Sequence, residues 1–272
     1  MDAVTACHSR QDFLRGGPEV MFGVDELTTG ETGSHGYMTS GPWSAGPANA
    51  AAVGVLADNV LGYALIAEAP PGMWSVSTEI SLDFTGPLPS DGTRMSAEGH
   101  LVHASPGTGL AEGSVFSSDG ELVARCRQWG RFVDASPGRD GGTGGFSGPC
   151  RSVAEVADAT AGEAPATGGR AWFSLPIEND LVNPLRTLHG GITLWLAELL
   201  ACRAVESVAP SLVPASLAVS YLRPFVHGDV ATFRAEVTSL GRRLVVTEVT
   251  GLNGDGKRCI VASAHHHGPA DG

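Results

Sequence analysis

An internal repeat limits what this chain can fold into more than any other feature of its sequence. A helical pattern from Pro47 to Ala69 is followed by the alternating stretch WSVSTEISLDF, from Trp74 to Phe84. The helical run HGGITLWLAELLACRAVESVA, which starts at His189, is followed in the same way by ASLAVSYLRPF, from Ala215 to Phe225. More segments with a two-residue apolar period follow in each half. Each half is therefore predicted to contain one apolar helix and about four strands.

Two pairs of landmarks show that the two copies run nearly in register. Glu198 lies 140 residues after Asp58, and the Asp-Gly pair at Asp255 lies 136 residues after the pair at Asp119. Asp-Gly pairs favour tight turns between antiparallel strands, so both are predicted hairpin tips. We predict an α+β fold in which each half is an antiparallel sheet wrapped around one long central helix. Such a helix is buried on all sides, which accounts for its apolar residues on nearly every face.

The segment DASPGRDGGTGGFSGPC, from Asp134 to Cys150, separates the two halves. Its glycines, prolines and small polar residues cannot build a core, so it is predicted to be a linker or a surface crossing. The predicted organisation is an N-terminal tail (1–17), an N-terminal unit (18–133), a Gly/Pro-rich linker (134–167), a C-terminal unit (168–267) and a short tail (268–272).

Charge and composition argue against several classes of protein. The net charge of −12 would repel nucleic acids and anionic membranes over most of the surface. No run approaches the roughly 18 apolar residues of a membrane span, and the N-terminus lacks a basic region followed by an apolar stretch. The five cysteines form no Cys-x-x-Cys pair, which fits unpaired thiols better than disulfides or a zinc site. We therefore expect a cytoplasmic protein that neither spans membranes nor binds nucleic acid.

A single carboxylate in the second apolar helix indicates chemistry. Acidic side chains are almost never fully buried unless they are paired or functional, and Glu198 stands among leucines and alanines. Backbone N–H groups at a helix N-terminus can stabilise an oxyanion, and glycine lets a carbonyl group come close. However, Gly190 and Glu198 are separated by roughly 12 Å along the helix. They are therefore too far apart to act on one carbonyl group.

Four motifs in the C-terminal half carry a family resemblance. Asn183, the run His189-Gly190-Gly191, an acid nine residues after the histidine and the sequence YLRP (Tyr221 to Pro224) resemble the hotdog-fold acyl-CoA thioesterases of the phenylacetate-thioesterase type. The resemblance is good over residues 171–264 and weaker over residues 40–133. It implies a tandem (double) hotdog that hydrolyses acyl-CoA or acyl-carrier-protein thioesters. Coenzyme A would be part of the substrate, no metal or other cofactor is expected, and two chains are expected to form a homodimer.

The resemblance also implies composite active sites. In that family the acid of one subunit faces the His-Gly-Gly turn of the other, so the N-terminal half would supply the acid for the C-terminal turn. Asp58 would then act as base or nucleophile, and the Gly190 N–H would be the oxyanion donor. Asn183 and Ser77 would position the water and the carbonyl group. His189 would complete the turn.

The second composite site would pair Glu198 with Asn49-Ala50-Ala51, the counterpart of His189-Gly190-Gly191. This turn lacks the histidine and the glycines, and Pro214 stands where the first site has Ser77. Glu198 is therefore expected to belong to a decayed site, and the first site is expected to carry the activity.

Charged and aromatic residues outside these sites suggest further roles. Arg242 and Arg243 are candidates to contact the phosphates of coenzyme A. The three consecutive histidines 265–267 alternate faces of a strand and cannot all bind one ion, so no metal site is expected. Candidates to line a tunnel for the acyl chain are Tyr63, Trp74 and Trp195.

Two other classes of function remain open. A hotdog hydratase or dehydratase would carry an aspartate and a histidine on one strand-to-helix segment, and that pairing is missing near Asp58. A non-catalytic scaffold protein would bind an acyl thioester without cleaving it. No Gly-x-Ser-x-Gly, Gly-x-Gly-x-x-Gly or phosphate-loop motif is present, which argues against serine hydrolases and nucleotide-binding enzymes.

Overall fold

The computed structural model of the protein describes residues 13–31, 33–134, 146, 148–161 and 166–268. Residues 1–12 and 269–272 of the predicted tails, and residues 135–145, 147 and 162–165 of the predicted linker, lie outside the described residues. The strand β6 ends at Val133 and β7 begins at Arg170, on either side of that linker. The predicted domain limits themselves stay a prediction.

Each half has one long helix and several strands. The N-terminal half contains α1 (Gly17–Phe22), β1 (Val24–Gly30), β2 (Gly33–Thr39), η1 (Pro42–Ser44), η2 (Pro47–Val53), α2 (Gly54–Ile66), β3 (Trp74–Phe84), β4 (Arg94–Ser105), β5 (Thr108–Phe116) and β6 (Leu122–Val133). The later elements are α3 (Val153–Ala161), β7 (Arg170–Pro176), η3 (Asn179–Leu181), α4 (Gly190–Glu206), β8 (Val213–Tyr221), β9 (Val230–Leu240), β10 (Leu244–Leu252) and β11 (Arg258–His267). The strands that precede the helices, β1, β2 and β7, were not expected from the repeat.

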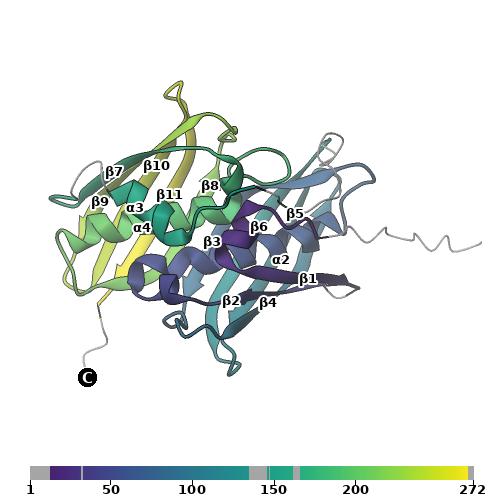
Figure 1. The fold of residues 1–272 in the computed structure, drawn as a ribbon, viewed down its shortest axis with the longest axis horizontal. Coiled ribbons are helices and arrows are strands. Elements are labelled where there is room, and N and C mark those ends of the chain that lie inside the picture. The colour runs from purple at the N-terminus through teal and green to yellow at the C-terminus, as the bar shows by residue number, and fades with distance from the viewer. Residues whose placement is uncertain (1–12, 32, 135–145, 147, 162–165, 269–272) are drawn as a thin grey trace, which may run out of the picture.

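The strands of the described chain form one antiparallel sheet that runs across the whole molecule (Figure 1). Their order is β1-β2-β4-β5-β6-β3-β8-β11-β10-β9-β7. The two halves meet at the centre, where β3 pairs with β8 from Glu79–Ser220 to Asp83–Ser216. The Asp-Gly pairs lie at hairpin turns as predicted, and Gly120 and Gly256 adopt φ values of 81° and 73° there.

The helices α2 and α4 lie against each other on one face of the sheet (Figure 1). Both are apolar on nearly every side because the sheet covers one side and the other helix another. The stretch Ala48–Ile66 is long and apolar enough to cross a membrane, but 78% of its most apolar window is buried inside the fold. It is therefore accounted for as a core helix.

The start of α2 differs from the prediction. Pro47–Val53 forms the 3-10 helix η2, and α2 begins only at Gly54. The N-terminus of α4 packs tightly against this junction: a Cβ atom on Gly191 would lie 2.6 Å from the carbonyl oxygen of Gly54. Glycine at position 191 thus allows the first turn of α4 to approach the first turn of α2.

Part of the predicted linker packs on the C-terminal unit. The Arg203 side chain in α4 donates hydrogen bonds of 2.8 and 3.0 Å to the carbonyl oxygens of Thr160 and Ala157 in α3. Arg151 donates two side-chain hydrogen bonds of 2.7 Å to the buried carboxylate of Asp180.

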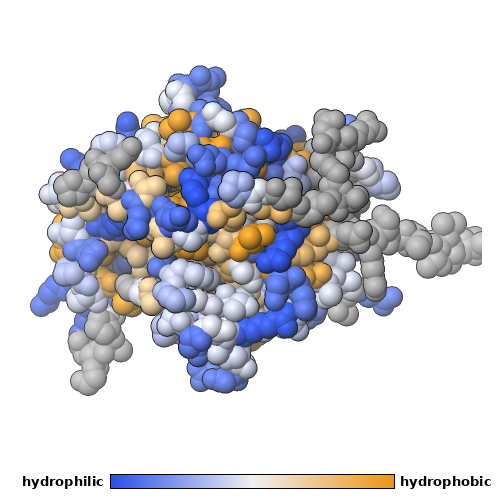
Figure 2. All heavy atoms as spheres, viewed as in Figure 1, coloured by the Kyte–Doolittle hydropathy of each residue, from blue (hydrophilic) through white to orange (hydrophobic). Residues whose placement is uncertain are grey.

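On the surface seen in Figure 2, hydrophobic and hydrophilic residues are interspersed.

Candidate active site

The Asp58 carboxylate reaches from α2 to the first turn of α4. The Gly191 N–H donates a 2.9 Å hydrogen bond to Asp58 Oδ2, and the Ser77 hydroxyl donates a 3.1 Å hydrogen bond to Oδ1. A Cβ atom on Gly190 would lie 2.6 Å from Asp58 Oδ2, so only glycine leaves room for the carboxylate there. The structure thus brings together Asp58 and Ser77 of one half with Gly190 of the other.

Gln128 on β6 orients the serine hydroxyl. Its side-chain nitrogen donates a 3.0 Å hydrogen bond to Ser77 Oγ. Because that oxygen accepts from Gln128, the hydroxyl proton of Ser77 is directed to Asp58. Sequence reasoning missed Gln128, because a glutamine on an alternating strand carries no distinctive spacing.

His189 lies between two carboxylates. Its Nδ1 atom is 3.3 Å from Asp58 Oδ2, and its Nε2 atom is 3.2 Å from Glu19 Oε1. Burial by itself lowers the pKa of His189, but the charge of Asp58 and the hydrogen bond and charge of Glu19 outweigh it, so the pKa is raised. Burial likewise raises the pKa of Glu19, yet its interactions with His189 lower it below the usual range. These interactions favour the imidazolium form of His189 and the carboxylate form of Glu19.

The Gly191 N–H has two acceptors within reach. Besides Asp58, it lies 3.0 Å from Nδ1 of His189, the N-cap residue of α4. A protonated Nδ1 atom cannot accept a hydrogen bond, so Asp58 is the acceptor when His189 carries its charge.

Glu19 is a site residue that sequence reasoning missed. It lies on the short helix α1 and is only 3% exposed. The side-chain amide of Asn59 donates a 3.0 Å hydrogen bond to Oε1, and the Gly16 N–H donates a 2.7 Å hydrogen bond to Oε2. Glu19 precedes the repeated segments and follows Pro18, so the sequence pattern is that of an ordinary acidic residue in a first helical turn.

The peptide group of Gly190 is held by Tyr221. The tyrosine hydroxyl donates a 2.8 Å hydrogen bond to the Gly190 carbonyl oxygen. Burial, together with the charge of Asp58, raises the pKa of Tyr221 far above its usual range, so the phenol stays neutral. No described residue accepts a hydrogen bond from the Gly190 N–H, which lies at the N-terminus of α4. That donor remains available to a ligand.

Asn183 shapes the loop that leads to His189. Its side-chain oxygen accepts hydrogen bonds from the backbone N–H groups of Leu185 and Thr187, at 3.0 and 3.2 Å, and from the Thr187 hydroxyl. Asn183 also lines the cavity described next. Its oxygen already accepts these hydrogen bonds within the loop, so the amide nitrogen is the part of the side chain that can donate a hydrogen bond to a ligand.

A cavity of about 760 Å³ opens beside Asp58 and is lined by both halves. Tyr63 and Trp74 contribute to its wall, whereas Trp195 is fully buried in the core and does not line it. The arginines of the wall are Arg131 and Arg223.

Arg242 and Arg243 lie elsewhere. Both are exposed in the turn between β9 and β10, and neither lines the cavity. Their predicted contact with coenzyme A therefore has no support from the geometry.

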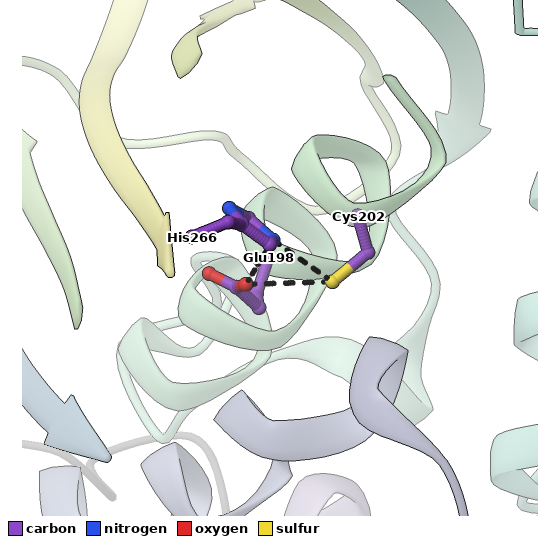
Figure 3. A group of neighbouring side chains, drawn as sticks. All are labelled: Glu198, Cys202 and His266. Carbon is purple, nitrogen blue, oxygen red and sulfur yellow. Dashed lines mark hydrogen bonds and ion pairs between the residues drawn. The ribbon is translucent and has the colours of Figure 1, made fainter. Parts of the chain in front are cut away.

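Glu198 has other partners than those expected. It is fully buried, and its Oε1 atom lies 3.3 Å from His266 Nε2 and 3.4 Å from Cys202 Sγ (Figure 3). The side-chain oxygen of Asn49 accepts a 3.1 Å hydrogen bond from the indole of Trp195 instead. The predicted pairing of Glu198 with Asn49-Ala50-Ala51 is therefore wrong. The pairing fails because Asn49, Ala50 and Ala51 belong to η2 and offer no free helix N-terminus.

Two family descriptions match separate parts of the chain. Residues 185–260 match the Thioesterase superfamily, and residues 10–132 match the acyl-CoA thioesterase C-terminal domain. A Caenorhabditis elegans protein to which esterase activity is attributed is 38% identical over 84 residues, which are 30% of this chain and 50% of that relative. The matched stretch thus spans half the length of that relative.

Solved structures resemble nearly the whole chain. A structure from Novosphingobium aromaticivorans, to which thioesterase activity is attributed, is 15% identical and has a TM-score of 0.63, with 90% of this chain and 98% of that chain covered. A hot dog fold protein of unknown function from Alicyclobacillus acidocaldarius is 12% identical and has a TM-score of 0.59, with 91% and 97% covered. The chain therefore has a hotdog fold.

Proposed function

We propose that the protein is a tandem hotdog thioesterase that hydrolyses acyl-CoA or acyl-carrier-protein thioesters at the Asp58 site. The observation that carries the proposal is the Asp58 carboxylate beside the unpaired Gly190 N–H, in a cavity lined by both halves. The two thioesterase family matches support the same reaction class.

The arrangement suits attack on a thioester carbonyl group. The carbonyl oxygen would accept a hydrogen bond from the Gly190 N–H, where the helix N-terminus favours negative charge. Asp58 would take a proton from a water molecule, and the resulting hydroxide would add to the carbonyl carbon. The C–S bond then breaks, and the departing thiolate takes up the proton. His189, when protonated, would add a positive charge next to Asp58.

Asp58 could also attack the carbonyl carbon directly and form a mixed anhydride, which water then hydrolyses. The two routes differ in the source of the oxygen atom in the first molecule of acid released. Under single-turnover conditions in ¹⁸O-water, a general base gives labelled product. A nucleophile gives unlabelled product and places the label in Asp58 after the anhydride is hydrolysed at its aspartyl carbon.

A panel of acyl-CoA and acyl-carrier-protein thioesters with a thiol-trapping reagent tests the proposal. Release of free thiol supports hydrolysis. No thiol release from any thioester of the panel, combined with measurable binding, would identify a scaffold protein instead.

A hydratase must be included in the same test. The sequence argument against it was the lack of an Asp–His pair near Asp58, but the structure places His189 3.3 Å from that carboxylate. Water addition to an enoyl thioester without thiol release would therefore overturn hydrolysis in favour of hydration.

We further propose that two chains associate. Light scattering at micromolar concentration should give twice the chain mass of 27.9 kDa. A single-chain mass would contradict this part of the proposal without affecting the hydrolytic one, because the residues of the Asp58 site all come from one chain.

A further inference from the structure

Glu198, Cys202 and His266 bring three metal-binding side chains to one buried point (Figure 3). Glu198 and Cys202 lie four residues apart on one face of α4, and His266 faces them from β11. The three residues are 0%, 9% and 1% exposed. We propose that these residues bind one divalent cation of the zinc class.

The distances between the three atoms fit coordination of a single ion. Glu198 Oε1 lies 3.3 Å from His266 Nε2, and Cys202 Sγ lies 3.4 Å from each of them. In a tetrahedron, zinc bonds of about 2.0–2.1 Å to oxygen and nitrogen and about 2.3 Å to sulfur place these ligand atoms about 3.3 to 3.6 Å apart. The observed triangle agrees with this spacing to within about 0.2 Å.

Hydrogen bonding alone leaves the cluster incompletely satisfied. Within the described chain, Glu198 Oε2 and His266 Nδ1 are buried and have no hydrogen-bond partner. Unpaired buried polar atoms are costly. A cation bound at His266 Nε2 accounts for the first of these atoms and leaves Nδ1 unpaired. A cation gives the carboxylate a reason to be buried, and Oε2 is available as a further ligand atom of the same side chain.

Charge balance favours the same conclusion. A zinc ion with one thiolate, one carboxylate and one neutral imidazole has no net charge, which suits a buried position. Binding would form the metal–sulfur bond and release the thiol proton of Cys202 to solvent.

The Asp58 cluster shows why similar residue types do not form a second such site. His189 uses its two ring nitrogens toward different carboxylates, Nδ1 toward Asp58 and Nε2 toward Glu19. Among the described residues, Asp58, His189 and Glu19 therefore do not form a group with one ligand atom from each side chain close to the other two. At Glu198 one nitrogen, one sulfur and one oxygen converge.

The sequence-based expectation of no metal site considered the three histidines only as a set. The structure agrees that they alternate, because His266 points inward and His267 is exposed. One member of the run is enough when a helix supplies the other ligands. That combination joins residues 64 positions apart, which no local motif reveals.

Metal analysis of the purified full-length chain tests the proposal. After treatment with a chelator and reconstitution with zinc, the desalted wild-type chain should retain about one zinc per chain, and its melting temperature should rise. Cys202→Ser and His266→Asn should each lose the bound zinc and the thermal response. Cobalt should give a thiolate charge-transfer band that Cys202→Ser lacks.

A matched control lies next to the cluster. His265→Asn alters a neighbouring histidine that has no place in the cluster, so it should keep full zinc content. Zinc binding lost equally in His265→Asn and His266→Asn would assign the metal to the run of histidines 265–267 instead of the Glu198 cluster and overturn the proposal. A wild-type chain with no retained zinc and no thermal response would do the same. Because hydrolysis is not measured, the result is independent of the proposed activity.

Discussion

Asp58 and Glu198 occupy corresponding positions of the two long helices, yet one faces a cavity and the other is sealed in the core. The 140-residue offset that relates these acids also relates Gly62 to Cys202. Gly62 lines the cavity, whereas the Cys202 side chain contacts Glu198. A residue without a side chain leaves space beside the first acid, and a thiol fills the corresponding space beside the second.

The strands beside the two acids also supply different side chains to them. Ser77 on β3 is paired with Gly130 on β6, whereas its counterpart Pro214 on β8 is paired with His266 on β11. The first acid thus receives a hydroxyl group, and the second receives an imidazole ring that closes over it. Two acids at corresponding positions of the two helices thus differ in their access to a cavity, because the neighbouring side chains decide what each acid contacts.

The largest expected effect is the difference in activity between the two variants in which one acid is exchanged for its amide. Asp58→Asn should lower kcat for thioester hydrolysis about a hundredfold or more, because the amide keeps the shape and cannot take a proton or attack. Glu198→Gln should keep most of the activity per folded chain, measured well below its melting temperature. The reverse ranking would make Glu198 the working acid, and equal partial losses would indicate two active sites.

His189 contacts a second acid, Glu19, and this contact also distinguishes the Asp58 cluster from the Glu198 cluster. Glu19→Gln should lower kcat about tenfold with little change in KM, because His189 loses the partner that keeps it charged and oriented. NMR titration of the imidazole should show a lower pKa than in the wild-type chain. An unchanged imidazole titration would mean that Glu19 does not position His189.

The Glu19–His189 pair should also make the stability of the fold depend on pH. The pKa of Glu19 is lowered from 4.5, so its contribution is present above pH 4.5 and is lost as the pH falls through the folded-state value. The pKa of His189 is raised from 6.5, so its contribution is present below pH 6.5 and is lost as the pH rises through the folded-state value. The melting-temperature difference between the wild-type chain and Glu19→Gln should therefore be largest between these two pH values. A pH-independent difference would contradict this.

A smaller effect is expected from Tyr221→Phe, which copies the residue found at the corresponding position of the other half, Phe84. The variant loses the hydrogen bond to the Gly190 carbonyl oxygen and keeps the ring. A loss of one such bond should lower kcat severalfold, about 1 kcal/mol of positioning energy. Steady-state kinetics at saturating substrate would measure it, and an unchanged kcat would show that the Gly190 peptide is held without the phenol.

The smallest effect concerns the space beside Asp58. Gly62→Ala should raise the free energy of unfolding by about 0.5–1 kcal/mol, because alanine is the better helix former. An added Cβ atom would meet nothing closer than the Gln128 side-chain nitrogen at 4.0 Å. Urea denaturation would measure the change. Destabilisation instead would show that the glycine is required by packing.

The helix and strand pattern of each half could be predicted because alternation and helical period are local properties of the sequence. The strand Trp74–Phe84 was predicted with its observed limits. The meeting of Asp58 with Gly190 came from the family resemblance, and the structure places them together. Glu19 and Gln128 could not be found this way, because their roles depend on contacts with residues far away in the chain.

The error at Glu198 has a similar origin. Aligning the two halves made Asn49 the counterpart of His189. The alignment could not show that Asn49 lies inside the 3-10 helix η2 and not at the start of an α-helix. Only the three-dimensional packing assigns the N–H groups of that segment to local turns.

The pairing of β3 with β8 inside one chain has a consequence for how the protein responds to dilution. In an assembly of separate subunits, a shared active site comes apart as the protein concentration falls below the dissociation constant. Here the linker keeps both contributors at a high effective concentration whatever the number of molecules per volume. The specific activity of the Asp58 site should consequently stay constant at protein concentrations where separate halves would no longer find each other.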